Sequence, residues 1–197
     1  MSAPDFRPKL ILASRSPRRR ELLAEAGYEF EVIPPSEFVE CGIPGESPAE
    51  MVARLARSKA ADVARRVPRG LVLGCDTVAE CDGRILGKPA GPDEARRMLQ
   101  SLRGRQHRVH SGICLWEVPG DRGTPWVRVR VAVTTLRMDP LGQEEIDEYL
   151  AGGQWQGKAG AFGYQDRLGW VHLVEGSESN VVGLPMELLA EMLRSAV

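Results

Sequence analysis

Apolar and polar positions along the chain predict strands and helices in alternation. Leu10–Ala13 is an uninterrupted apolar run, which is typical of a strand that is buried on both faces. Ser16 and Pro17 then predict a helix start, because serine is a favoured N-cap residue and proline suits the first helical position. Residues 28–33 alternate between apolar and polar, as in a half-buried strand. The chain therefore begins as strand, helix and strand.

The rest of the chain continues this pattern. The sequence Ser47-Pro48-Ala49-Glu50 predicts a helix start with a capping box. Leu71–Leu73 predicts a second buried strand, and Asp82-Gly83 predicts a hairpin turn after it. The other expected elements are a helix from Pro92, antiparallel strands at 108–116 and 126–138, a helix from Asp139 to about Leu150, a strand at 170–174 and a last amphipathic helix after Pro185. Together these elements predict an α/β fold.

Composition narrows the function classes. The 197 residues carry 26 basic and 27 acidic side chains and a formal net charge of −1, which argues against a protein that coats nucleic acid. No apolar run approaches the roughly 18 residues of a membrane span, and the N-terminus lacks an apolar signal region. The four cysteines and three histidines lack metal-ligand spacing. We therefore expect one cytoplasmic domain of residues 1–197 with reduced thiols, without a membrane or nucleic-acid partner.

A cluster of arginines marks the first helix start. The free backbone N–H groups of a helix start and the positive end of its dipole bind anions, and Arg18 and Arg19 fall in the first helical turn. Cations in this position cost about 0.3–1 kcal/mol each, so their presence favours a strongly negative ligand such as a phosphate chain. The alternative is that both arginines simply solvate a surface turn. This stretch alone does not decide between the two interpretations.

One carboxylate and two lysines extend this candidate site. Lys59 stands where the apolar stripe of its helix would place an apolar residue, so it either snorkels to the surface or points into a cleft beside the sheet. Asp76 follows the strand at 71–73, at the carboxyl end where α/β sheets place their chemistry, although an aspartate there can also cap a neighbouring loop. The predicted hairpin then brings Lys88 back near Asp76.

Two loops carry weaker signals. Residues 36–46 contain Glu37, Glu40 and Glu46 without periodicity, as in an exposed loop that is usually only solvated surface but can hold a divalent cation beside a phosphate site. Residues 158–165 are glycine-spaced, which allows a close approach to another surface. They include Lys158 and Gln165, whose amide can recognise the edge of a nucleobase.

Five motifs carry a resemblance to a known family. They are 14–23 (Ser-Arg-Ser-Pro-Arg-Arg-Arg-Glu-Leu-Leu), 75–78 (Cys-Asp-Thr-Val), 86–89 (Leu-Gly-Lys-Pro), 158–165 (Lys-Ala-Gly-Ala-Phe-Gly-Tyr-Gln) and 180–185 (Asn-Val-Val-Gly-Leu-Pro). In this order, and over nearly the whole chain, they resemble the Maf family of nucleoside triphosphate pyrophosphatases, also called septum formation inhibitor proteins. The resemblance implies a mixed sheet with flanking helices and two lobes around a deep cleft, related to the inosine triphosphate pyrophosphatases.

The resemblance also implies an activity and a set of site residues. Members of the family are acid anhydride hydrolases that convert a nucleoside triphosphate to the monophosphate and pyrophosphate with a divalent metal, expected here to be Mg, Mn or Co. By motif, Asp76 is then the catalytic carboxylate and a metal ligand, with Glu40 as a second ligand. The residues implied to bind the substrate are Ser14, Arg18, Arg19, Lys59, Thr77, Lys88, Lys158 and Gln165.

Three of these positions indicate the substrate. Arg18, Thr77 and Gln165 resemble the branch of the family that acts on dTTP and UTP, not the branch that prefers 7-methyl-GTP. Such an enzyme would clear the nucleotide pool. The alternative is a non-catalytic nucleotide-binding regulator of cell division that uses the same cleft. The retained Asp76 favours the enzyme, since a carboxylate repels a triphosphate unless a metal lies between them. A homodimer is one possible assembly.

Three residues depart from the family pattern. Asp166 stands where glycine is usual, and a carboxylate beside the base could accept from an exocyclic amine and favour cytosine. Gly157 stands where an acidic residue is common, so the base-reading loop can differ here. Val39 replaces the first member of an acidic pair whose second member is Glu40, which weakens metal binding through that loop.

Overall fold

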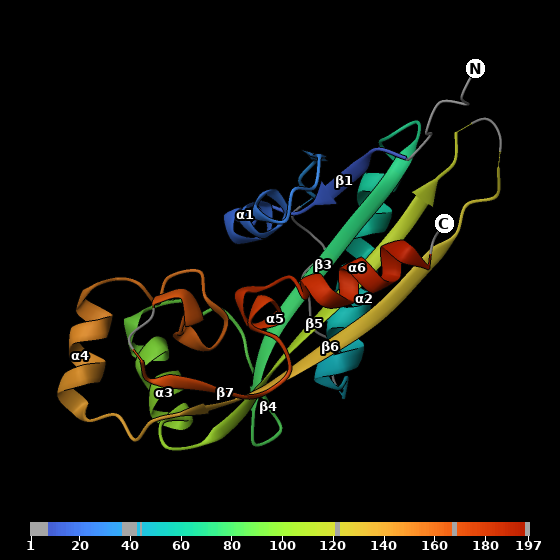
Figure 1. Cartoon of the computed structure of the whole chain (residues 1–197). Helices are drawn as coiled ribbons and strands as arrows, with labels where there is room; N and C mark the ends of the chain where they lie inside the picture. Colours follow the sequence, from blue (N-terminus) through green and yellow to red (C-terminus); the bar gives the residue numbers. More distant parts are fainter. Residues whose placement is uncertain (1–7, 37–42, 44, 121–122, 167–168, 196–197) are drawn as a thin grey trace.

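The computed structural model describes residues 8–36, 43, 45–120, 123–166 and 169–195 (Figure 1). Within these residues, seven strands form one mixed sheet in the order β2-β1-β3-β5-β6-β7, and β4 pairs with β3. β1 is parallel to β2 and β3, whereas β3, β5, β6 and β7 pair antiparallel. The strands are β1 (Leu10–Ala13), β2 (Phe30–Val32), β3 (Gly70–Cys81), β4 (Arg84–Leu86), β5 (Gln106–Val118), β6 (Val127–Met138) and β7 (Val171–Glu175). The mixed α/β fold expected from the sequence is confirmed.

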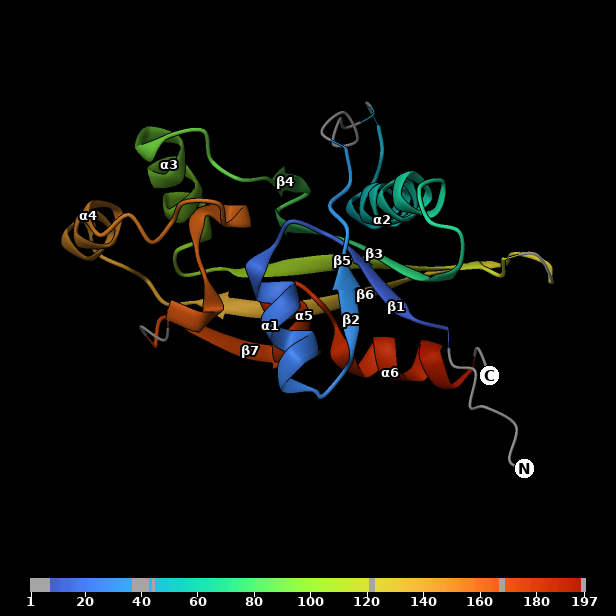
Figure 2. The same cartoon turned by 90° about the horizontal axis from the view of Figure 1, so that it is seen from above.

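Helices cover both faces of the sheet, with α2 and α6 on opposite sides (Figure 2). The helices are α1 (Pro17–Glu25), α2 (Pro48–Ala64), α3 (Pro92–Leu102), α4 (Gln143–Ala151), α5 (Glu178–Val182) and α6 (Met186–Arg194), with short 3-10 turns η2 (Ala159–Ala161) and η3 (Tyr164–Asp166). Ala56 of α2 packs against Val72 on one face, and Leu23 of α1 and Leu189 of α6 pack near Leu73 on the other. Among the described residues, no helix has the length and apolar content needed to cross a bilayer.

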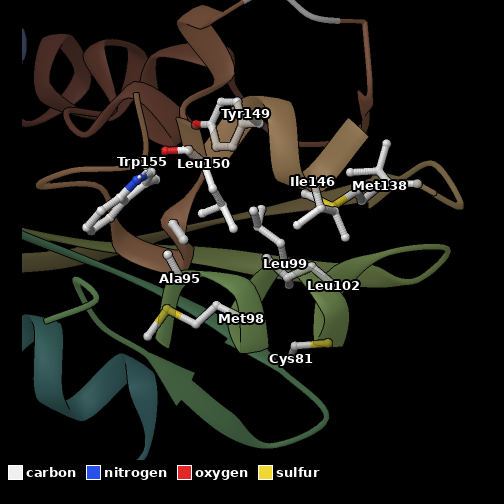
Figure 3. Close-up of a cluster of buried hydrophobic side chains, with 12 residues drawn as sticks. Cys81, Ala95, Met98, Leu99, Leu102, Met138, Ile146, Tyr149, Leu150 and Trp155 are labelled. Carbon is white, nitrogen blue, oxygen red and sulfur yellow. Dashed lines mark hydrogen bonds between the residues drawn. The ribbon is translucent and has the colours of Figure 1, made fainter. Parts of the chain in front are cut away.

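A third group of apolar side chains holds α3 and α4 at one end of the sheet (Figures 1 and 3). Leu99 and Leu102 of α3 meet Ile146 and Leu150 of α4, and Met138 of β6 closes the cluster. All five are at most 8% exposed. Trp155 and Ala161 belong to the same cluster, which thereby holds η2 against the end of β3 at Cys81.

The extent of β3 differs from the sequence prediction. The predicted strand at Leu71–Leu73 is too short, because β3 continues to Cys81. Asp76 therefore lies within a long strand and not at its carboxyl end, which corrects the expectation. The glycine at position 74 does not end the strand, since its register with β5 continues without a shift.

Two glycines instead allow α2 to lie directly on the sheet. A Cβ at Gly74 of β3 would lie 2.2 Å from the carbonyl oxygen of Ala56, and a Cβ at Gly112 of β5 would lie 2.2 Å from that of Val52. Both distances are far below any normal contact, so these positions admit no side chain unless α2 moves. The glycines thus set the distance between α2 and β3, and with it the position of Lys59.

Most of the other predicted elements are confirmed. Ser47 and Glu50 form the expected capping box of α2, and Asp82 and Gly83 have φ angles of 51° and 78°, as a tight hairpin turn requires. α4 begins at Gln143 and not at Asp139, because residues 139–141 form a turn in which an N–H bonds back two residues along the chain. The sequence did not predict α5, whose five residues are too few to show a helical period.

Candidate active site

A break in the pairing of β3 defines the site. Along one side of β3, β1 pairs as far as Gly74, and β4 begins to pair only at Ala79. Within the described chain, residues 75–78 therefore have no neighbouring strand on this side, although they pair with β5 on the other. We call residues 75–78 the open edge of β3. A cavity of about 690 Å³ lies against it.

This cavity brings together nearly all the site residues predicted from the sequence. Its lining includes Ser14, Arg18, Arg19, Lys59, Asp76, Thr77, Lys88 and Lys158. They come from the turn after β1, from α1 and α2, from the open edge, and from the segments after β4 and before η2. Glu40 and Val39 lie outside the described residues, as does the side chain of Gln165, so their roles remain predictions.

Asp76 and Lys59 form a buried ion pair in the wall of the cavity. Lys59 Nζ donates to Asp76 Oδ1 at 2.6 Å. The side chain of Asp76 is 11% exposed and that of Lys59 is 7% exposed. Lys59 reaches the carboxylate because α2 lies directly on β3. Of the two interpretations of Lys59, the structure shows the lysine in the cleft and not at the surface. Asp76, in turn, caps no loop of the described residues.

Arg19 is buried and donates four hydrogen bonds within the protein. Nε donates to the carbonyl oxygen of Gly183 and Nη1 to that of Cys75, each at 2.8 Å. Two longer bonds of 3.2 Å reach Ser14 Oγ and Thr77 Oγ1. The guanidinium therefore joins the turn after β1, the open edge and the turn between α5 and α6. The interpretation of Arg19 as a solvated surface residue is wrong, and a direct bond to phosphate remains a prediction.

Two further cations lie less deeply in the cleft. Arg18 is half-buried, and its Nη2 donates to the carbonyl oxygen of Gly157 at 3.4 Å. Its Nε is buried and has no hydrogen-bond partner among the described residues. Burial, and next the charge of Arg19, lower the pKa of Arg18. Lys88 is exposed at the rim. A bound anion would relieve the repulsion between these cations.

Asp166 directs its carboxylate toward the protein. Its oxygens accept hydrogen bonds from Lys158 Nζ, from Tyr149 Oη at 2.6 Å and from the N–H of Gly163 at 3.2 Å. Burial and the hydrogen bond to this carboxylate raise the pKa of Tyr149. Asp166 is not among the residues that line the cavity, and its role as an acceptor for an exocyclic amine stays a prediction. It anchors the segment from Lys158 to η3, and the ammonium of Lys158 is already paired.

The described residues offer few ligands for a divalent cation. They contain no cluster of three or more histidine, cysteine or acidic side chains able to hold a metal. Asp76 nevertheless fits such an ion, because only its Oδ1 is bonded to another described residue. Mg²⁺ is commonly held by one or two carboxylates together with the phosphates of the substrate. Asp76 with a triphosphate meets that requirement.

The sequence assigned no role to residues 181–183, which also line the cavity. The carbonyl oxygen of Gly183 accepts hydrogen bonds from Arg19, from Thr77 Oγ1 at 3.2 Å and from Cys75 Sγ at 3.3 Å. Its φ angle of 127° suits glycine alone. A glycine between Val-Val and Leu-Pro was the available signal, but nothing in the sequence showed which carbonyl it would present.

The fold and the cavity define a class of protein, an α/β protein in which cations from several elements surround one paired carboxylate. The chain belongs to the family of Maf-like proteins, whose model matches residues 9–196. It is 53% identical over 188 residues to the dTTP/UTP pyrophosphatase of Rhodopirellula baltica, covering 94% of this chain and 81% of that protein. It is 44% identical over 190 residues to the dTTP/UTP pyrophosphatase of Anaeromyxobacter dehalogenans, covering 96% and 94%. The family predicted from the motifs is confirmed.

The fold has a counterpart among solved structures. The Ham1 protein of Staphylococcus aureus superposes with a TM-score of 0.52 at 14% identity, over 96% of this chain and 100% of that one. At this level of identity, the similarity concerns the fold alone.

Proposed function

We propose that this protein is a nucleoside triphosphate pyrophosphatase that acts on dTTP and UTP. The observation that carries the proposal is the buried pair of Asp76 and Lys59 in a cavity that also gathers Ser14, Arg18 and Lys88. The cations can bind the phosphates of a triphosphate, and the carboxylate can assist hydrolysis of the bond between two of them. The relatives named dTTP/UTP pyrophosphatase support the same activity. They do not support a non-catalytic regulator.

The start of α1 supplies a place for the phosphates. Ser16 is the N-cap residue, but its side chain makes no capping hydrogen bond, and the first turn contains no acidic residue. The N–H groups of this turn therefore remain available to a ligand, and the helix dipole attracts negative charge to them. Arg18 in the same turn and Lys88 across the cavity add positive charge.

Asp76 supplies the group that can take a proton from water. Lys59 orients the carboxylate through Oδ1. Oδ2 can then accept a proton from the attacking water or coordinate a metal ion. Transfer of the proton to Asp76 turns the water into a better nucleophile, and the bond between the α- and β-phosphates then breaks to release pyrophosphate. A divalent ion held by Asp76 and the phosphates would neutralise charge on the phosphate oxygens.

The substrate assignment rests on Arg18, Thr77 and Gln165, together with the names of the relatives. An amide such as that of Gln165 offers a donor and an acceptor on one plane, which match a carbonyl and the imide N–H of thymine or uracil. A site that pairs with one pattern of donors and acceptors rejects another, because its own groups are left without partners.

Steady-state kinetics of pyrophosphate release from dTTP, UTP, CTP, GTP and 7-methyl-GTP test the proposal. We expect kcat/KM for dTTP and UTP to exceed that for the other three at least about tenfold, which corresponds to about 1.4 kcal/mol. A clear preference for CTP or 7-methyl-GTP would overturn the substrate assignment but not the activity. If none of the five nucleotides yields pyrophosphate with Mg²⁺, Mn²⁺ or Co²⁺ present, the proposed activity itself is wrong.

A further inference from the structure

The open edge of β3 presents main-chain groups to the cavity. The N–H of Leu71 points away from β5 and donates to the chain next to β1 at 2.9 Å, and the carbonyl of Cys75 points the same way, toward α1. The register with β5 is continuous over residues 70–80. Because the main-chain groups of successive residues in a strand alternate between its two sides, the N–H and C=O of Thr77 face the open edge as well.

These two groups of Thr77 have no partner in the described part of the protein. They lie beyond the last pairing with β1 and before the first pairing with β4, and no hydrogen bond joins them to another described residue. Main-chain donors and acceptors withdrawn from bulk water require partners. The side chain of Thr77, by contrast, is already bonded to Arg19, Ser111 and Gly183. The main chain of Thr77, not its hydroxyl, is what remains available to a ligand.

The cavity that these groups face also has apolar lining, beside the charged side chains of Arg19, Lys59 and Asp76. Met51 and Leu55 of α2 line the cavity from one face of the sheet, and Val181 and Val182 of α5 line it from the other. The four residues of the open edge span about 13 Å along the strand. A cavity with such apolar lining beside free main-chain groups can accept a flat ring whose edge carries hydrogen-bonding groups.

We propose that the N–H and C=O of Thr77 bind the imide edge of the pyrimidine base. The N–H donates to the C4 carbonyl oxygen of uracil or thymine, and the C=O accepts from N3–H. An added strand would make the same pair of bonds with a sheet edge. This inference rests on the proposed function and extends it. It assigns the N3–H and the C4 carbonyl of the base to the main chain of β3, and Gln165 is then left with other groups of the base, such as the C2 carbonyl.

Cytosine in the same position would oppose this arrangement. Its N3 is an unprotonated acceptor, which would face the acceptor C=O of Thr77, and its exocyclic amine would face the N–H. The N–H and the C=O of Thr77 would then both lack a hydrogen-bond partner, at a cost of about 1–3 kcal/mol each. Main-chain recognition therefore favours UTP over CTP without any requirement on a side chain.

Kinetics with UTP and N3-methyl-UTP test the inference. Methylation removes the N3–H and places a methyl group against the carbonyl of Thr77, so we expect kcat/KM to fall at least about 100-fold. If N3-methyl-UTP is hydrolysed within about threefold of UTP, the inference is wrong while the pyrophosphatase activity stands. If UTP itself is not hydrolysed, the proposed function fails, and the inference with it.

Two variants separate the main chain from the side chains. Thr77→Val removes the hydroxyl and keeps the N–H and C=O, and Gln165→Ala removes the amide. In both we expect the ratio of UTP to N3-methyl-UTP in kcat/KM to stay above about 30. A ratio that falls below this value in either variant would assign the imide to that side chain and overturn the inference. Calorimetric binding of UMP and N3-methyl-UMP gives the same comparison for a variant without measurable turnover.

Discussion

Replacing Arg19 with alanine tests how the cavity is held together. The side chain is 8% exposed and donates to four acceptors. Without it, the carbonyl of Gly183 keeps other donors, but the carbonyl of Cys75 on the open edge loses its bond from Nη1. A buried acceptor left without a donor costs about 1–3 kcal/mol, and the lost packing and the two longer bonds add to that. We expect the free energy of unfolding to fall by about 3 kcal/mol, or roughly 6–12 °C in Tm.

Urea unfolding followed by tryptophan fluorescence measures this loss. Arg19→Lys keeps the charge but cannot reach all four acceptors, so it should lose nearly as much stability as Arg19→Ala. Arg20→Ala, at the exposed neighbouring position, is the control and should change stability by less than about 0.5 kcal/mol. A loss below about 1 kcal/mol for Arg19→Ala would refute the reasoning. It would restore the simpler expectation from charge alone, in which removing one cation from a cationic cleft leaves stability unchanged or raises it.

Three further changes test other parts of the structure. Gly112→Ala should lower stability by about 1–3 kcal/mol or more and reduce turnover by displacing α2. Gly91→Ala, in open space at the N-cap of α3, should cost less than about 1 kcal/mol and leave turnover unchanged. A near-neutral Gly112→Ala would contradict the close packing. Burial lowers the pKa of His107 from 6.5 to about 4, so the unfolded chain binds more protons and stability should fall by up to about 3 kcal/mol as pH drops through this range. His107→Phe should flatten that slope and His172→Phe should not, as urea unfolding at pH 7.5 and 4.5 would show. Asp166→Gly should release the loop, raising KM for dTTP more than it lowers kcat; equal KM values would remove its positioning role.

Features that depend on a few neighbouring residues could be predicted from the sequence. The capping box of α2 and the turn at Asp82 and Gly83 are both local, and both are confirmed. The length of β3 could not be predicted in this way. Whether Gly74 ends a strand or makes room for a helix depends on Ala56, which is distant in sequence and packs above it only in the fold. Asp76 lies within β3 because the strand continues past Gly74.

In the candidate site, too, the sequence predicted which residues take part but not the contacts that they make. The members of the site were identified by motif and order, and the described ones meet in one cavity. Their partners could not be inferred, because they are set by tertiary contacts. Arg19 bonds to Gly183, which is 164 residues away in the sequence, and Asp166 takes Lys158 and Tyr149 as partners from its own loop and from α4. The sequence shows that cationic side chains are present, but not which of them form hydrogen bonds or ion pairs within the protein.

Pyrophosphate release by Asp76→Asn is the most direct measurement on the proposed mechanism. The amide can still accept a hydrogen bond from Lys59 but cannot take a proton from water, so kcat for dTTP should fall at least about 100-fold in protein whose circular dichroism matches the parent. Glu80→Gln is the matched control, because Glu80 is a buried carboxylate of the same strand that lies outside the cavity. It should stay within about threefold of the parent. If folded Asp76→Asn retains more than about a tenth of the parent rate, Asp76 is not the catalytic group.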